Sequence, residues 1–428
     1  MIKKIIVFVS FLLFTSSFSQ KNNISPYSFF GIGAFSESKT VNEHSMGIGT
    51  ALNSPHKLYF SNPASIASLR FTTYTLGLTN TFTKIDDGVN DPQESSAFAL
   101  SYIALGFPVG EKAGVSFGLQ PYSKVGYSIS QNTLNDDDET ESSLYKGTGR
   151  TNKVFINYGQ KLPYNINIGI ETSYVFGNLE RSILSRNNDR IDQRASYYKT
   201  DTNIKGLSFK IGAQHMYKLN DKLNIQSGIS LLLENTLSNI GNEKLVSLAN
   251  STNPDRIIFG FDKQEIFNRD FDGTITMPLK TAFSTGVGSS KKWFVGVEYD
   301  FQNANSFTDN FSQRNGYVKH INKTNLAFGG FYIPKATSIT KYWERITYEA
   351  GFHLKQVGLE IENTAIKDFG MSFGVSLPSK KQLSNINLGF DIGKRGEINN
   401  NGLIKENYYN FRLSLSFNDK WFRKRKLN

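Results

Sequence analysis

Histidine is scarce and cysteine is absent in this 428-residue sequence, which limits metal and nucleophilic chemistry. No histidine has a second ligand at the spacing of a zinc site. The five histidines are His44, His56, His215, His320 and His353. There is no cysteine, which excludes thiolate ligands, cysteine nucleophiles and disulfides. The sequence therefore predicts no metal and no cofactor.

Glu349 and His353 are the best-placed pair for hydrolytic chemistry, because residues four apart share one face of a strand. A hydrolase would also need a nucleophile at the same site. No serine can be assigned to that role, so we expect this pair to belong to a polar network inside the protein. The prediction is that the chain has no catalytic residues and is not an enzyme.

Two further motifs could bind ions or phosphates, but both fit such sites poorly. The acidic run 136–141 matches the spacing of no calcium loop, and a solvated loop is expected there. The Gly-x-Gly pairs at 31–33 and 47–49 lack the third glycine and the helix of a dinucleotide site. Tight turns are the expected role of these glycines.

Residues 1–19 have the form of a secretory signal peptide. Lys3 and Lys4 precede an apolar run at 5–14, and small residues lead to an expected cleavage after Ser19. The run is too short to cross a bilayer of about 30 Å, and no later stretch reaches the roughly 18 apolar residues of a spanning helix. An exported protein without a transmembrane helix is expected.

The formal net charge of +11 first suggests a nucleic-acid partner. However, the charge is concentrated at the ends, with two lysines in the signal peptide and five basic residues among the last nine. About +4 remains for the body of the chain, without a basic stripe. No nucleic-acid partner is therefore expected.

Alternation is the strongest pattern in the rest of the chain. Apolar residues at 369–377 alternate with glycine and serine, and the same period recurs at 293–299, 386–392 and 411–417. Period two places every apolar side chain on one face of a strand. The other face carries mainly Gly, Ser and Asn, whereas the outer face of a soluble sandwich is usually rich in Thr, Lys and Glu.

This pattern predicts an all-β, transmembrane antiparallel barrel. In lipid every backbone N–H and C=O must be paired internally, and strands achieve this only in a closed sheet with apolar residues outside. The low apolar share of 39% fits, because the bilayer then supplies the apolar partner in place of a protein core.

The connections support the same architecture. Short turns near 109–112, 162–165, 219–222, 289–292 and 379–382, with a longer one at 335–344, alternate with longer polar segments. The longer segments lie at about 85–95, 130–148, 185–197, 238–272, 303–318, 358–367 and 394–407. Thirteen connections imply about fourteen strands, and the even number places both termini in the periplasm.

The chain outside the strands divides into two parts. Residues 20–71 are rich in Gly, Ser, Asn and Pro, and they suit a hatch that plugs the lumen of the barrel predicted at 72–418. Trp421 and Phe422 suit an interface belt, within a basic periplasmic tail at 419–428. A solvated tail is favoured over a peptidoglycan or protein contact.

The triplet Asn62-Pro63-Ala64, which follows a Gly-rich stretch and precedes the first predicted strand, resembles the hatch of the FadL family of outer-membrane transporters. The opening at 26–33 and the ending at 418–422 resemble the version found in Bacteroidetes-type bacteria. The resemblance implies a fourteen-stranded barrel with an N-terminal hatch in the outer membrane of a Gram-negative bacterium. Family members carry long-chain fatty acids or aromatic hydrocarbons.

Pro121 and Gly126 fall in the third predicted strand, where proline marks a bulge or a break. In the FadL family a kink in the third strand opens the barrel wall, so that an apolar ligand leaves sideways into the membrane. The resemblance implies such an opening here, and an ordinary bulge near the membrane rim is the alternative.

Three functions remain open. The first is passive uptake of a hydrophobic small molecule with lateral release into outer-membrane lipid, which favours each methylene by about 0.8 kcal/mol over water. The alternative is a non-transporting barrel that is a subunit of a larger outer-membrane secretion or protein-assembly complex. The third, a barrel enzyme, lacks a nucleophile.

Overall fold

The computed structural model describes residues 25–251, 262–289, 292–304, 318–379, 384–399 and 403–419. The predicted signal peptide, Trp421 and Phe422 and nearly all of the basic tail lie outside the described residues. Short elements come first, namely η1 (Pro26–Phe29), β1 (Ala34–Phe35), α2 (Val41–Met46) and η2 (Pro63–Ser68). No helix in the described ranges is long and apolar enough to cross a membrane.

The wall strands follow, and most are joined by short turns. They are β2 (Thr72–Asp86), β3 (Gln93–Val109), β4 (Ala113–Leu134), β5 (Thr140–Lys161), β6 (Ile166–Asn187), β7 (Ala195–Lys218), β8 (Asn224–Leu232), β9 (Asn235–Leu248), β10 (Lys263–Met277), β11 (Lys280–Ser289), β12 (Trp293–Gln302), β13 (Val318–His320), β14 (Lys323–Tyr332), β15 (Thr347–Ile361), β16 (Thr364–Pro378), β17 (Asn385–Arg395) and β18 (Lys405–Asp419). The turns include η3 (Pro163–Asn165) and η5 (Tyr342–Arg345).

These elements form a closed antiparallel barrel of fourteen strands, as predicted. β18 pairs with β2 along its whole length, from Lys405 opposite Asp86 to Asp419 opposite Thr72, which closes the ring. β8 and β9 lie one after the other along β7, and β10 and β11 lie along β9 and β8 in turn. β13 and β14 likewise share β15, so each of these pairs is one interrupted wall strand.

The alternation of the sequence is realised in the wall. On β7 the outward Leu207, Phe209 and Ile211 are exposed, while the inward Ser208 and Lys210 are buried. The same outward apolar belt continues around the barrel, as a lipid-facing wall requires.

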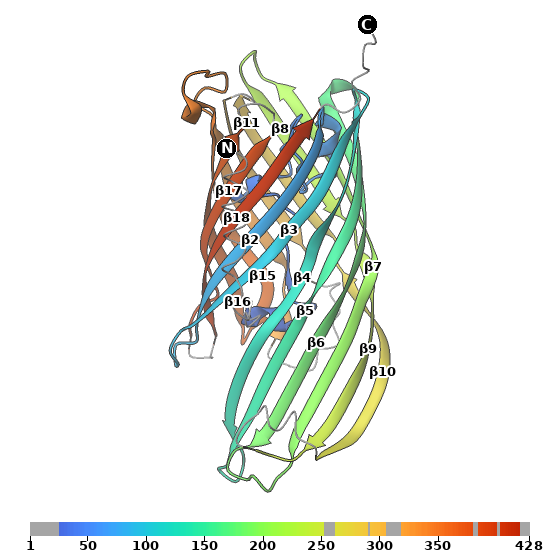
Figure 1. Cartoon of the computed structure of the whole chain (residues 1–428), viewed down its shortest axis with the longest axis vertical. Helices are drawn as coiled ribbons and strands as arrows, with labels where there is room; N and C mark the ends of the chain where they lie inside the picture. Colours follow the sequence, from blue (N-terminus) through green and yellow to red (C-terminus); the bar gives the residue numbers. More distant parts are fainter. Residues whose placement is uncertain are drawn as a thin grey trace.

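The barrel is strongly asymmetric in height. β11, β12 and β14 have 10 residues each, which matches the about 9–11 residues that cross a bilayer. β4, β5 and β6 have 22 residues and β7 has 24, so they continue well beyond the belt. Figure 1 shows β4, β5, β6, β7, β9 and β10 extending below the other strands, at the end opposite the short turns.

The long loops predicted at 130–148 and 238–272 are therefore wrong in extent, because most of those residues are in strands, whereas the loop predicted at 185–197 is shortened to 188–194. In the extension, beyond the belt, polar side chains face outward and apolar side chains face inward. On β7 the outward residues become polar at Asn203 and Asp201, while the inward Ile204 is buried. Period two persists, but without outward apolar residues it does not resemble a membrane strand.

Belt and extension should respond differently to charge. Phe209→Lys places an ammonium group on the lipid-facing side and is expected to lower the free energy of unfolding by about 2–4 kcal/mol. Asn203→Lys, on the same face of β7 but above the belt, should lower it by less than about 1 kcal/mol. Urea unfolding from lipid vesicles measures both, and equal losses would contradict this placement of the belt.

Candidate functional site

The residues before the first wall strand form what we term the N-terminal segment, residues 25–71. α2 contacts β14 to β18, whereas η2 contacts β3 to β7. Because these strands lie in opposite halves of the ring, the segment crosses the interior of the barrel. Ile32, Ile48 and Ala64 are at most 1% exposed, so much of the segment is buried, whereas Phe35 is 38% exposed.

Asn62, Pro63 and Ala64 begin η2 and hold it against the wall. The Oδ1 of Asn62 accepts a hydrogen bond from the backbone N–H of Ala64 (3.0 Å), which caps the helix, and Pro63 occupies its first position. The Asn62 amide donates to the Thr50 carbonyl at 2.9 Å and lies 3.1 Å from the wall carbonyls of Ala213 and Ile229. The triplet thus has a positioning role.

Glycines of neighbouring strands line up beneath the segment in two rows. The first glycine row, across β4 to β7, consists of Gly114, Gly159, Gly169 and Gly212. The second glycine row, across β12, β14 and β15, consists of Gly296, Gly329 and Gly351.

Both rows allow the backbone of the segment to touch the wall. A methyl group on Gly212 would overlap the Oδ1 of Asn62, and one on Gly159 would lie 2.6 Å from Ile66. A methyl group on Gly351 would lie 2.6 Å from the carbonyl oxygen of Met46. Sequence analysis found these glycines only as small inward residues, because nothing in one strand shows that its glycine is in register with those of its neighbours.

Glu43 joins the two halves of the segment. Thr40 and Glu43 form a capping box, in which the Thr40 N–H donates to the Glu43 carboxylate at 2.7 Å. The same carboxylate accepts from the N–H groups of Phe60 (3.1 Å) and Ser61 (2.9 Å). Burial raises the pKa of Glu43, while these donors favour its ionised form. Sequence analysis missed this residue, although the Thr-x-x-Glu spacing signals a capping box.

Buried wall carboxylates fasten the segment at further points. Glu298 pairs with Lys39 at 3.1 Å and accepts the N–H groups of Gly49 and Thr50, both at 2.7 Å. Glu349 faces inward as predicted and accepts from Asn42 at 2.7 Å. The sequence around a single carboxylate in a β-strand does not indicate which distant residue it will contact.

Lys210 extends this fastening across the wall. Its ammonium group donates to the Phe60 carbonyl at 2.7 Å and pairs with Glu171 at 2.9 Å. Lys153 pairs with the same carboxylate at 2.7 Å. The three charged residues therefore link β5, β6 and β7 to the N-terminal segment.

His353 also faces inward, and its hydrogen-bond partners in the described part of the chain are Asp368 and Tyr408. Its Nε2 lies 3.3 Å from Asp368 and 3.2 Å from the Tyr408 hydroxyl. Asp368 in turn pairs with Arg395 at 2.9 Å. This is the polar network that the sequence predicts. In the described part of the chain, no group of three His, Cys, Asp or Glu side chains could hold a metal ion.

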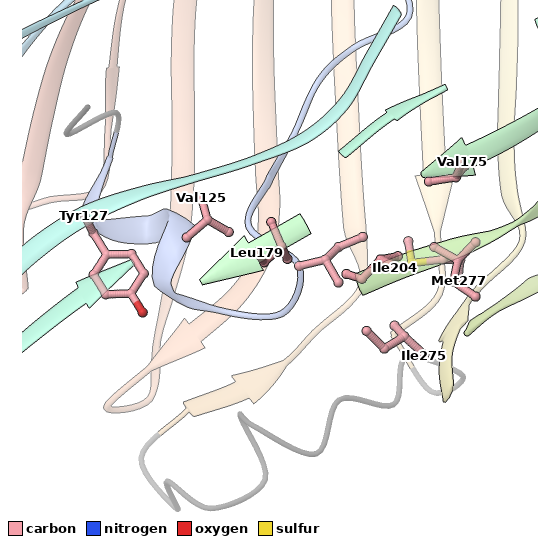
Figure 2. Packing of buried hydrophobic residues seen from close by; sticks show 9 residues of the cluster. Val125, Tyr127, Val175, Leu179, Ile204, Ile275 and Met277 are labelled. Carbon is pink, nitrogen blue, oxygen red and sulfur yellow. The ribbon is translucent and has the colours of Figure 1, made fainter. Parts of the chain in front are cut away.

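An apolar cluster fills the interior at the level of the extension. It joins Ile32 of the N-terminal segment to inward residues of β4, β6, β7, β9 and β10. The wall members are Val125, Tyr127, Val175, Leu179, Ile204, Leu237, Ile275 and Met277, of which seven are labelled in Figure 2. The expectation that the bilayer replaces a protein core is thus wrong here, because the extension stands outside the belt and needs a core of its own.

The wall parts between β3 and β4. Their ladder runs from Val109 opposite Ala113 to Ile103 opposite Leu119 and ends there. Beyond this ladder, toward the extension, β3 pairs only with β2. β4 continues along β5 with a register shift between Pro121 and Ser123. Proline at this bulge is consistent with its missing donor.

The N-terminal segment occupies the edge of β4 that β3 leaves. β1 pairs with β4, with Ala34 opposite Lys124 and Phe35 opposite Ser123. At η1, the N–H of the N-cap residue Ser25 donates to the Gly126 carbonyl (3.1 Å), and the Gly126 N–H donates to the Ser28 hydroxyl (3.0 Å). Pro121 and Gly126 therefore flank the stretch where the segment replaces β3.

A cavity of about 250 Å³ lies beside this stretch, and polar and apolar atoms share its surface about equally. The wall contributes hydroxyls of Thr79, Thr81 and Ser101, and charges come from Lys124 and Arg412.

Comparison with known proteins places the chain in a family. The model of the BamG family matches residues 1–428. The chain belongs to the BamG family. No curated protein sequence matches this BamG-family chain.

Solved structures show which barrels share the fold. The Pseudomonas putida toluene transporter TodX has a TM-score of 0.61 and 15% identity, over 90% of this chain and 100% of that one. A Pseudomonas aeruginosa FadL homologue gives 0.57 and 11% over 90% and 99%, and the CymD monoaromatic hydrocarbon channel gives 0.56 and 13% over 90% and 98%. The FadL-like resemblance is therefore right about the fold, while the family that the sequence matches bears another name.

The first glycine row makes a sharp prediction. Gly212→Ala should force Asn62 away from the wall and weaken the docking of the N-terminal segment by about 1–3 kcal/mol. Faster tryptic cleavage after Lys57 in the folded barrel would report this. The control is Ala213→Val, which adds bulk on the outward face of the same strand. Equal protection of Lys57 in wild type and Gly212→Ala would contradict the proposed fit.

Docking should also weaken in acid. Burial and the charge of Arg412 lower the pKa of His44 well below its usual range, with Lys39 and Lys355 adding to the effect and Glu37 opposing it. Below about pH 6.5 the histidine of the undocked segment takes up a proton that the docked one does not. The stability of the docked state therefore decreases as the pH is lowered. His44→Gln should flatten this part of the fall in thermal midpoint between pH 7.5 and 5.5. An unchanged slope would contradict it.

Proposed function

We propose that this chain is an outer-membrane barrel that acts as a subunit of a larger assembly complex and does not conduct. The observation that carries this is the fit of the N-terminal segment, which Glu298, Lys210 and Asn62 hold across the lumen. Such a lumen suits a scaffold better than a path for solutes. The family name supports the same view, because it has the form given to subunits of the Bam barrel-assembly machinery.

In this proposal the chain keeps the organisation predicted from its sequence. Residues 1–19 are the signal peptide, 20–71 form a plug, 72–418 form the barrel and 419–428 a periplasmic tail. The short turns and both termini then face the periplasm, and the extension, formed by β4 to β7 with β9 and β10, stands on the outer side. An origin in a Bacteroidetes-type bacterium stays a prediction.

Extraction of native membranes in mild detergent tests the proposal. The expected result is a defined complex much larger than the 48.1 kDa chain, and depletion of the chain should lower the amounts of other outer-membrane barrels. A control depletion of an unrelated barrel should leave those amounts unchanged. Recovery of only the free monomer would contradict the proposal.

A second candidate is a channel for hydrophobic molecules with lateral release, and the parting of β3 and β4 at Leu119 favours it. The printed names of the similar structures describe toluene and monoaromatic hydrocarbon channels. Against it stand the charged side chains of Lys124 and Arg412 in the cavity at the gap and the pairing of β1 there. If cells lacking the chain take up labelled toluene and fatty acid at the wild-type rate, this candidate fails.

A further inference from the structure

The edge of β4 remains open beyond the N-terminal segment. We term residues 128–134 the free edge of β4. β3 has already separated at Leu119, and the backbone hydrogen bonds of the segment to β4 end at Gly126. Within the described ranges, the free edge makes no backbone hydrogen bond to any element other than β5.

The register shows which backbone groups are unpaired. Both the N–H and the C=O of Gly126 point away from β5, toward Ser28 and Ser25. The β4–β5 register is regular from Ser123 to Leu134, so the backbone groups of alternate residues point the same way. These residues are Ser128, Ser130, Asn132 and Leu134, and all four side chains are exposed.

This edge lacks the features that usually protect exposed strands. Proteins generally guard such edges with charges, prolines or bulges. None of these occurs between Val125 and Leu134, where the sequence is uncharged and contains β-branched residues. The free edge, residues 128–134, spans about 23 Å at about 3.3 Å per residue, which is as long as a typical strand.

The two faces beside the edge differ in polarity. On one face Ile129 lies opposite Tyr145, and both pack against the apolar cluster. On the other face Ser128 lies opposite Lys146. A strand added here would place alternate side chains on an apolar and on a polar surface.

We propose that the free edge of β4 binds an extended segment of a partner subunit, whose residues alternate between apolar and polar, as an additional strand. Main-chain pairing of this kind is a recurrent mode of peptide recognition. The N-terminal segment already uses the same edge at Ser123 and Lys124, so the partner strand continues an existing interface. The inference rests on the proposed role as a complex subunit.

A second copy of this chain does not fit the edge. Two copies in one membrane are related by an axis along the membrane normal, and each strand is tilted by about 35–45°. Their β4 strands would therefore cross at roughly 80° instead of lying antiparallel, and no ladder would form.

Hydrogen exchange resolved by residue tests the pairing. It compares the purified native complex with the isolated barrel in the same detergent. The amides of Ser128, Ser130, Asn132 and Leu134 should exchange at least tenfold more slowly in the complex. Those of Ile129, Gln131 and Thr133, which face β5, serve as internal controls and should exchange equally slowly in both samples.

A matched pair of variants tests the consequence. Ser130→Pro removes an N–H that β5 does not use and should leave the barrel folded, as shown by the mobility difference between unheated and boiled samples in gels. It should reduce recovery of the complex about tenfold. Ser130→Ala keeps the N–H and should recover the complex at the wild-type level.

Each outcome decides between explanations. Wild-type recovery with folded Ser130→Pro, or equal exchange at the four amides, would overturn the inference while the complex itself stands. Protection of these amides already in the isolated barrel would assign the edge to the chain's own N-terminal residues and also overturn it. Absence of any complex would remove the proposed function as well.

Discussion

The need to pair every backbone N–H and C=O group in lipid governs this structure. It closes the wall, with β18 on β2, into a ring of fourteen strands. The same need explains the path of the N-terminal segment. β3 pairs with β4 only from Ile103 to Val109, so the backbone groups of β4 beyond Leu119 would otherwise lack hydrogen-bond partners on that side. β1 and Ser25 pair with the abandoned edge up to Gly126. Beyond that point the wall has left the belt, and water can solvate what remains unpaired.

The polarity of the side chains on each face of the wall depends on whether that face contacts lipid, water or the protein interior. Within the belt, Phe209 faces outward and Lys210 inward, whereas in the extension Ile204 faces inward and Asn203 outward. The interior is consequently divided into a charged level around α2 and an apolar level around Ile32. Buried ion pairs contribute little net stability because desolvation opposes them, but a misplaced partner is costly. Pairs such as Lys39 with Glu298 therefore fix the position of the segment.

Much of the fold could be predicted because strand periodicity is local. Alternation at 369–377 marks the belt of β16, and the turns at 109–112, 162–165 and 219–222 mark one end of the barrel. The extension could not be predicted in this way, because its outward residues resemble those of a loop. The site was predicted only in part. Asn62 was found through its motif, while the contacts of Glu298 and the alignment of the glycine rows were missed, because their partners lie far away in the sequence.

The sequence by itself determined that the chain forms an apolar-outside barrel, because the side-chain period of a strand follows from backbone geometry alone. It also determined the number of strands, which depends on counting local turns. Tertiary structure alone decided where β3 and β4 part and what fills the gap. Those features depend on inter-strand register, which brings Gly114, Gly159, Gly169 and Gly212 into one row and Ser25 to Gly126. Register is set by pairing between distant strands, and no single stretch of sequence contains it.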